Sequence, residues 1–191
     1  MLSPCSQLNI QVSPLASTLA PRQQLQQTCM IECMQPFGEP PQLSVRFMSS
    51  SAPVQLLLRM PVPPSKFFSP LKVDGPDFFR RWKVLEGKEV QKIFKLKTSP
   101  LPPAEVERVA STGLRMAVLN GVDPNAANYV VAGWIVTKGH AQPQSDDTSV
   151  LMRLEVNAAA GMCRASVRAM NSDLISSVLQ LVQSQLAAQG A

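Results

Sequence analysis

The sequence of 191 residues has few of the side chains that bind metals or form disulfide frameworks. His140 is its only histidine, and its four cysteines are Cys5, Cys29, Cys33 and Cys163. Zinc sites need several such ligands at short spacings, and Cys29 and Cys33 are too far apart for a redox CxxC motif. On a strand these two would share one face, where cysteine packs as a small apolar side chain. We therefore expect no metal site and no disulfide framework.

Catalytic motifs are missing as well. The nine glycines are scattered and form neither a phosphate-binding loop nor a dinucleotide fingerprint. His140 lies in a polar segment, residues 139–147, where no motif places a nucleophile or a carboxylate beside it. These absences indicate binding rather than catalysis, and we expect neither an enzyme nor a cofactor.

Long apolar runs are also absent, and no segment approaches the length that spans a bilayer. The N-terminus lacks the basic start of a signal peptide and is interrupted by Pro4. Apolar residues make up 45% of the chain and charged residues 16%, so a sizeable core is feasible. These features favour a cytosolic protein of one domain or two small ones.

Two halves with different hydrophobic patterns meet near residue 68. Within residues 1–67, strand-like segments are separated by prolines and lie at 8–12, 24–34, 43–47 and 54–60. This pattern predicts an incomplete antiparallel β-sandwich. Four strands are too few to cover both faces of a sandwich. Either they pack on the second half or strands before Leu8 are missing, and we expect the latter.

Residues 68–191 mix helical and strand patterns. Helices are expected at 77–85, 103–111 and 173–189, and strands at 114–119, 129–137, 150–156 and 162–170. The apolar residues of the last helix recur at helical spacing, which predicts one apolar stripe packed on a sheet. The expected fold class is α+β, with an antiparallel sheet flanked by helices in this second subdomain.

The most informative segment is residues 77–82, which read DFFRRW. Helical spacing places Phe78, Trp82 and Leu85 along one face. An aromatic stripe usually belongs to a core, and we assign Phe78 to it. Basic residues surround Phe79 and Trp82, so that edge of the helix must reach water. For these two residues a core position and a groove position are equally open.

Four charged residues lie on the last two predicted strands. Arg153 and Glu155 are two apart, and Arg164 and Arg168 are four apart, so each pair shares a face. A hairpin through residues 157–161 would gather all four on one patch. Glu155 would then hold one guanidinium and leave the others for a ligand carboxylate. Aromatic walls beside arginines suit short peptides that carry a carboxylate and a phenylalanine. The alternative is an ordinary solvated sheet face.

The net charge of +5 is unevenly distributed. Seven lysines and arginines lie between Arg80 and Lys97, opposed only by Glu86 and Glu89. Such a positive stretch favours acidic partners, although it is more often a solvated surface. A second hypothesis is a nucleic-acid-binding module that stacks bases on Trp82, but we do not expect nucleic acid as the partner.

Residues 8–187 resemble the appendage, or ear, of the alpha-adaptin family of clathrin adaptor subunits. The matching segments are LNIQVSPLASTLAPRQQLQQ, LLLRMPVPPSKFFSPLKV, DFFRRWKVL, VDPNAANYV, VLMRLEVN and CRASVR. Each segment is weak alone, but the combination is specific and covers nearly the whole chain. The resemblance implies an N-terminal β-sandwich followed by a platform, which is a sheet flanked by helices.

The resemblance also implies a function. The platform groove of this family recruits endocytic accessory proteins through Asp-Pro-Phe, Asp-Pro-Trp and Phe-x-Asp-x-Phe motifs. The family's groove residues correspond to Phe79, Trp82, Arg153, Glu155, Arg164 and Arg168, all of matching type. The implied role is clathrin-mediated endocytosis and protein transport. The implied location is the cytoplasm at plasma-membrane coated pits, with membrane contact only through the coat.

The chain departs from the family pattern in three ways. The family's sandwich begins before the equivalent of Leu8, so we expect the early strands and the sandwich's own Trp-Val-x-Phe site to be missing. We also expect the trunk and hinge to be missing, so other adaptor subunits are expected as partners only if a trunk is present. A third hypothesis is a trunkless fragment that binds partners without joining the coat. Cys163 replaces a bulkier residue, which would reshape the groove locally.

Overall fold

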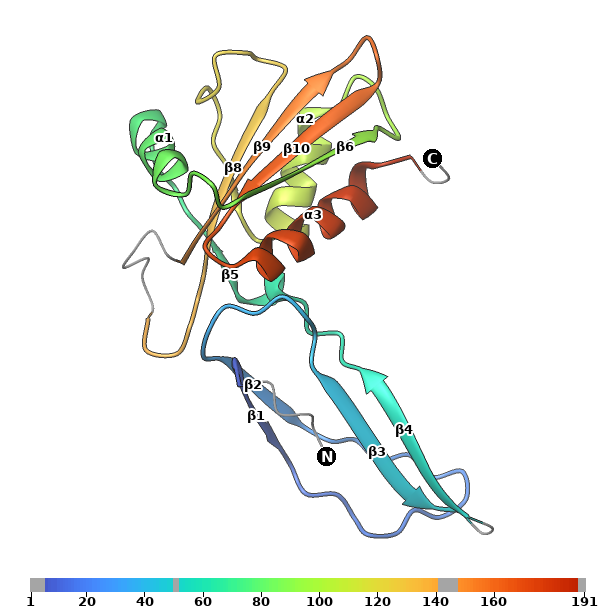
Figure 1. The fold of residues 1–191 in the computed structure, drawn as a ribbon. Helices are drawn as coiled ribbons and strands as arrows, with labels where there is room; N and C mark the ends of the chain where they lie inside the picture. The colour runs from blue at the N-terminus through green and yellow to red at the C-terminus, as the bar shows by residue number, and fades with distance from the viewer. Residues whose placement is uncertain (1–5, 50–51, 141–147, 189–191) are drawn as a thin grey trace.

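The computed structural model describes residues 6–49, 52–140 and 148–188. The described chain forms two parts, a set of N-terminal β-ribbons and a larger C-terminal part with helices on both faces of an antiparallel sheet (Figure 1). They meet at a short 3-10 helix, η1, at Pro64–Phe67. The α+β class is confirmed. The division between residues 67 and 68 stays a prediction.

The N-terminal part consists of two separate two-stranded antiparallel sheets. Strand β1 (Leu8–Val12) pairs with β2 (Cys29–Cys33), and β3 (Gln42–Met48) pairs with β4 (Pro53–Arg59). All four predicted strands are present, although the expected strand at 24–34 is limited to β2. Cys29 and Cys33 lie on that strand as inferred, whereas Cys5 lies outside the described residues. Several large apolar side chains of these ribbons are exposed, among them Met48 and Leu57.

The C-terminal sheet contains six strands, all paired antiparallel. Its order is β5-β8-β9-β10-β6, and β7 pairs with β8 beside β5. The strands are β5 (Phe68–Pro70), β6 (Glu89–Lys95), β7 (Ala117–Val118), β8 (Tyr129–Ile135), β9 (Ser149–Asn157) and β10 (Met162–Arg168). Strand β6 therefore lies at one edge, next to β10.

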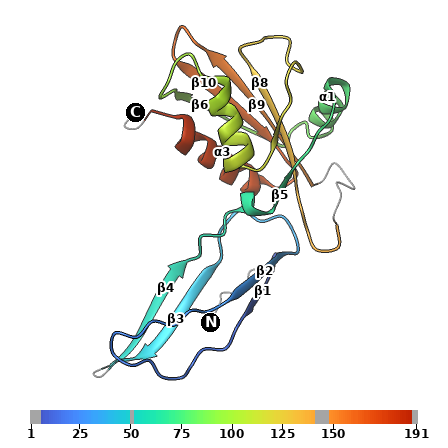
Figure 2. The ribbon, with the colours of Figure 1, turned by 180° about the vertical axis from the view of Figure 1, so that it is seen from behind.

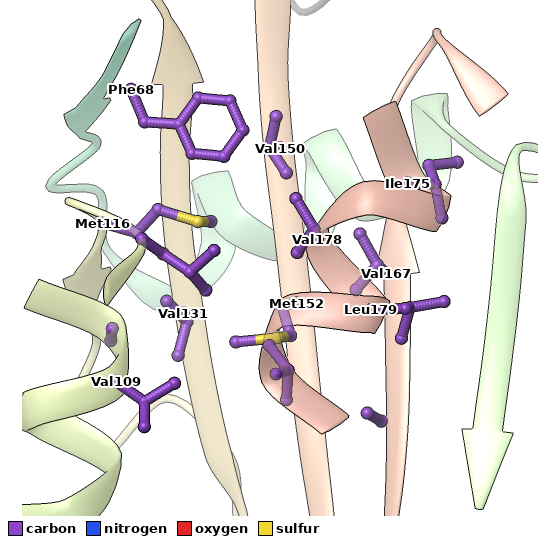
Figure 3. Close-up of a cluster of buried hydrophobic side chains, with 14 of the residues drawn as sticks. Phe68, Val109, Met116, Val131, Val150, Met152, Val167, Ile175, Val178 and Leu179 are labelled. Carbon is purple, nitrogen blue, oxygen red and sulfur yellow. The ribbon is translucent and has the colours of Figure 1, made fainter. Parts of the chain in front are cut away.

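Helices cover the two faces of this sheet differently. Helix α1 (Gly75–Val84) lies on one face, where Phe78 and Leu85 are buried with Trp134 and Leu151 of the sheet. Helix α2 (Pro103–Glu107) continues as a π-helix, η2 (Arg108–Gly113), and α3 (Ser172–Leu186) lies with it on the other face (Figure 2). The apolar stripe of α3 packs on the sheet as predicted, with Val178 and Leu179 facing β9 and β10 (Figure 3).

Local sequence accounts for where α1 and α3 begin. The Asp74 carboxylate accepts a hydrogen bond from the backbone N–H of Asp77 at 2.9 Å, which caps α1, and a proline lies in its first turn. The Asn171 side chain accepts from the N–H of Leu174 at 2.8 Å and caps α3. The described part of α3 ends at Leu186, and residue 189, its expected end, lies outside the described residues.

One strand expected from the sequence is much shorter than predicted, and two strands, β5 and β6, were not predicted. The strand expected at 114–119 is limited to Ala117–Val118, because Arg115 adopts a left-handed backbone with φ of 57° that breaks the extended chain. Strand β6 was not predicted at all. Its side chains are mostly polar, and Phe94 is its only buried residue, so it lacks the apolar pattern of a core strand. Most of the polar loop expected at 139–147 lies outside the described residues.

The two parts of the chain contact each other closely at α3 and after β8. The Ser177 hydroxyl donates to the carbonyl of Gly38, and the backbone N–H of Lys138 donates to the carbonyl of Cys33 at 2.7 Å. A Cβ atom added at Gly38 would lie 2.6 Å from the carbonyl carbon of Asp173, closer than real Cβ atoms approach. Glycine is therefore required at this contact.

We expect Gly38→Ala to reduce the free energy of unfolding by about 1–3 kcal/mol, because the new methyl group must displace the start of α3. Thermal denaturation followed by circular dichroism measures the change. Gly113→Ala is the matched control, since its Cβ would meet only Leu181 at an ordinary 3.6 Å. Equal melting temperatures for the two variants would contradict the proposed close contact.

Candidate functional site

The aromatic residues of α1 divide between core and surface. Phe78 is fully buried, stacks on Trp82 with ring centroids 5.6 Å apart, and meets the edge of Phe79 at 5.4 Å. Trp82 is half-buried, and Phe79 is 39% exposed. Phe78 therefore belongs to the core as predicted, whereas Phe79 and part of Trp82 reach the surface, and their place in a groove stays a prediction.

The charged strand residues lie on the same face of the sheet as α1. In the β9–β10 hairpin, Arg164 is opposite Glu155 and Ser166 is opposite Arg153. Arg168, two residues beyond Ser166, shares this face. The hairpin and the gathering of these side chains are as expected from the sequence. The site thus combines one edge of α1 with the exposed strip of β9 and β10.

Two arginines approach the indole of Trp82. The guanidinium carbon of Arg168 lies 4.4 Å from the ring centroid, and that of Arg153 lies 6.0 Å from it. A guanidinium at such distances is attracted to the electron-rich ring face. Arg168 also donates from a terminal nitrogen to the backbone carbonyl of Trp82 at 2.5 Å. This hydrogen bond satisfies a backbone carbonyl in the last turn of α1, where a positive charge is favourable, and it attaches the helix to β10.

The prediction that Glu155 leaves the other guanidinium groups unpaired was wrong. Arg164 pairs with Glu155 at 2.6 Å, Arg153 with Asp123 at 2.8 Å, and Arg168 with Glu89 at 2.5 Å. Sequence patterns missed Asp123 and Glu89, because the first lies in the loop before β8 and the second in the unpredicted strand β6. A guanidinium has five N–H donors, so each arginine retains donors beyond its internal ion pair.

Asp123 is the most buried acid of the site, with 4% of its side chain exposed. Burial alone would raise the pKa of its carboxyl, but hydrogen bonds from Arg153, the Asn125 backbone and Asn128 lower that pKa overall. The Asp123 carboxylate therefore holds Arg153 in place beside Trp82. Within the described chain, Nε of Arg153 is buried and has no hydrogen-bond partner.

Glu89, Arg164 and Cys163 of the site also have shifted pKa values. Burial would raise the pKa of Glu89, but hydrogen bonds from Gln91 and Arg168 lower it overall. The Glu155 hydrogen bond raises the pKa of Arg164. Burial, assisted by the negative charge of Glu155, raises the pKa of the Cys163 thiol to about 12. Cys163 is therefore an unreactive packing residue near neutral pH.

A hollow of about 370 Å³ lies beside Arg164 and Glu155. Its wall includes Ile93 of β6, which lies opposite Arg164 and is 68% exposed, and Asn125 of the loop before β8. Cys163 also contributes to this wall. The exposure of Ile93 became evident only from the structure.

The basic segment 80–97 does not form one continuous positive face. Arg80 and Arg81 both pair with Asp77 on α1, at 2.7 and 3.0 Å, whereas Lys97 pairs with Glu105 of α2 at 2.7 Å. Across the described residues, no cluster of histidine, cysteine, aspartate and glutamate has a metal-binding arrangement. None of the described helices combines the length and apolar character needed to cross a membrane.

Comparison with known proteins identifies the family. The sequence profile described as "Alpha adaptin AP2, C-terminal domain" matches residues 66–186. The chain belongs to this family. The match covers the sheet and helices that build the site, and it agrees with the fold expected from the resemblance.

Curated relatives extend the match into the N-terminal part. The chain is 35% identical over 181 residues to "AP-2 complex subunit alpha-2" of Dictyostelium discoideum, covering 94% of this chain and 18% of that protein. It is 28% identical over 163 residues to "AP-2 complex subunit alpha" of Schizosaccharomyces pombe, covering 84% and 18%. It is 25% identical over 134 residues to "AP-2 complex subunit alpha-1" of Arabidopsis thaliana, covering 69% and 13%. The chain thus spans less than a fifth of each relative.

The Asp123–Arg153 pair predicts an acid-sensitive contribution to stability. Because the pKa of Asp123 is lowered by folding, its stabilisation is present above the unfolded value of about 3.9 and is lost as pH falls through the folded value. Asp123→Asn should reduce the free energy of unfolding at pH 7 by about 2 kcal/mol and flatten its acid dependence. Urea denaturation between pH 7 and pH 3 measures both effects.

Glu86→Gln is the control for this prediction, because Glu86 is exposed just beyond α1 and makes no ion pair within the described residues. That variant should follow the parent chain at every pH. If Asp123→Asn also followed the parent chain, the proposed role of Asp123 in holding Arg153 would be wrong.

Proposed function

We propose that this chain is a clathrin-adaptor appendage that binds short Asp-Pro-Phe, Asp-Pro-Trp and Phe-x-Asp-x-Phe motifs of endocytic accessory proteins. Its place of action is the cytoplasmic side of the plasma membrane, in clathrin-coated pits, in support of endocytosis and protein transport. Family membership and relatives named as AP-2 alpha subunits support the adaptor role. The chemistry of the groove supports the motif.

The single observation that supports motif binding most strongly is the guanidinium of Arg168 stacked 4.4 Å from the half-exposed indole of Trp82. The exposed ring of Phe79 lies on the same helix one turn earlier. A ligand phenylalanine that packs on Phe79 and on the part of Trp82 left uncovered by Phe78 and Arg168 would bury apolar surface and make aromatic contacts. Its neighbouring carboxylate would then lie within reach of arginine N–H groups.

Internal ion pairs determine how a ligand carboxylate can bind. Arg153, Arg164 and Arg168 each already pair with an internal carboxylate, and Arg153 also lies 3.8 Å from Glu155. The ligand aspartate therefore uses remaining N–H donors of a group that is close to neutral overall. This arrangement favours recognition by hydrogen-bond geometry over attraction by net charge. A groove of this kind selects a carboxylate placed correctly beside an aromatic ring and discriminates against merely acidic peptides.

The affinity of one motif is expected to be low. A motif of three to five residues buries far less than the roughly 1,200 Å² of a stable interface, so each contact should have a dissociation constant of about 1 μM or weaker. Ligands with several motif copies, and several appendages on one coat, would raise the overall affinity through avidity. Assembly with other adaptor subunits is attributed to the parts of a full-length subunit that this chain does not match.

Trp82→Ala should abolish capture of an Asp-Pro-Phe peptide while the fold persists, because the indole is only partly buried at the margin of the core. Isothermal titration calorimetry measures the affinity, and circular dichroism verifies the fold. Val84→Ala, which removes an exposed side chain of the same helix, should bind as the parent chain does. Unchanged affinity in Trp82→Ala would refute the anchor role of the indole.

Arg164→Ala should weaken acidic peptides more than neutral analogues, since it removes a donor and leaves the Glu155 carboxylate largely uncompensated, with only Arg153 at 3.8 Å. We expect a loss of about tenfold for the acidic peptide. The double variant Arg164→Ala/Glu155→Gln should recover part of this loss, because the uncompensated negative charge is gone. Equal losses for acidic and neutral peptides in fluorescence-polarisation titrations would exclude a charge-specific role.

A further inference from the structure

Strand β6 ends the sheet and has only one neighbouring strand, β10. Figure 1 shows it along the margin of the C-terminal part, close to the end of α3. An edge strand presents backbone N–H and C=O groups that can pair with another extended chain. The hydrogen bonds near the two ends of β6 show which of its residues point their backbone groups away from β10.

Residues at the end of β6 mark the outward direction. The carbonyl of Lys95 accepts from the N–H of Ala188 at 2.9 Å, and the N–H of Lys97 donates to Leu186 at 3.0 Å. These bonds, together with the antiparallel bridge between Leu96 and Ala187, add the end of the chain to the outer edge of β6. The outer edge therefore already pairs with another segment of the same chain, where residues 186–188 lie beside residues 95–97.

Among the described residues, the rest of the outer edge has no neighbouring strand. Backbone groups alternate in direction along a strand, so Glu89, Gln91 and Ile93 point outward like Lys95. Lys88 and Leu96 point the other way, as the alternation requires: the Leu96 N–H donates to the carbonyl of Gly161, just before β10, and the Lys88 carbonyl accepts from the N–H of Ala169, just after it. Within the described residues, the outward groups of Glu89, Gln91 and Ile93 form no hydrogen bond.

The same strand forms the outer wall of the candidate groove. The Glu89 side chain pairs with Arg168, which lies on the Trp82 ring, and Ile93 lies opposite Arg164. A peptide whose aromatic residue is bound at Trp82 therefore needs to cross only this wall to reach the open edge.

Charge indicates what kind of segment fits there. Lys88 and Lys95 form no ion pair within the described chain, and Nζ of Lys92 bonds only the neutral side chain of Gln183. The one acid of the strand, Glu89, is already paired with Arg168. Lysines commonly protect edge strands against pairing with other apolar strands. An acidic segment is not repelled in this way, because its carboxylates are attracted to the lysine side chains.

We propose that the outer edge of β6, from Glu89 to Ile93, binds an acidic extended segment that flanks the motif held in the groove, as an added β-strand. Main-chain hydrogen bonds would supply affinity, and the lysines would select acidic flanks. This inference rests on the proposed motif-binding function. It implies that the sequence around a motif, and not the motif alone, determines which ligands bind best.

The test compares peptides by isothermal titration calorimetry with the intact chain. One peptide contains the Asp-Pro-Phe motif alone, and two others add an acidic five-residue flank at either end. We expect at least one flanked peptide to bind about tenfold more tightly than the motif alone. Two further peptides have N-methyl groups on alternate amides of the flank, one on the even and one on the odd positions. Only one of these sets faces β6, so one peptide should lose the tighter binding given by the flank and the other should keep it.

Gln91→Pro supplies the matched protein variant. It removes an outward N–H but no hydrogen bond to β10, and proline is tolerated at an edge in this orientation. The short motif should bind Gln91→Pro within about twofold of the parent chain, whereas the gain from the flank should be lost. Gln91→Ala keeps the N–H and should keep the gain.

The outcomes separate the two hypotheses. If the short motif binds but neither flank improves it, the β6 proposal is overturned and the proposed function stands. If no peptide binds, the proposed function itself fails. If analytical ultracentrifugation shows self-association that Gln91→Pro removes, the edge pairs copies of this chain, and the proposal is again overturned. The N-methylated peptides decide the question even if Gln91→Pro disturbs the fold.

Discussion

The packing of α1 on the sheet is the interaction on which the candidate groove depends. Phe78 buries its ring against the strands and supports Trp82 from one side, while Arg168 covers the indole and bonds its backbone carbonyl. The indole is thus positioned by core packing and by an arginine from a strand distant in sequence. Aromatic surface is exposed next to hydrogen-bond donors because this helix cannot rotate without exposing Phe78.

Acidic residues inside the site limit its charge and fix its shape. Asp123 and Glu89 hold Arg153 and Arg168 in single positions, and this reduces the entropy that would be lost when a ligand orders a long side chain. The same pairing keeps the groove close to neutral. In the proposed function, such a surface would recognise a short motif by shape and donor position and would release it readily.

Sequence patterns predicted the parts of this fold that bury a regular apolar face. Strands β8 to β10 have a strong apolar pattern, and helices α1 and α3 also have capping residues, so all five elements could be inferred. The alternation along β9 and β10 then placed Arg153, Glu155 and Arg164 on one face. Strand β6 could not, because an edge strand with mostly polar side chains resembles a basic surface loop. The acidic partners of Arg153 and Arg168 were missed for a related reason: they come from that strand and from a loop, and pairing across such distances leaves no local signal.

The position of the two indoles has an optical consequence. The chain contains only two tryptophans, and Trp134 is buried beneath α1 whereas Trp82 is half-exposed beside a guanidinium. A change in solvent contact at the groove therefore alters the emission of one fluorophore against a constant background from the other. The protein has its own spectroscopic reporter, so that occupancy of the groove can be followed without attaching a dye.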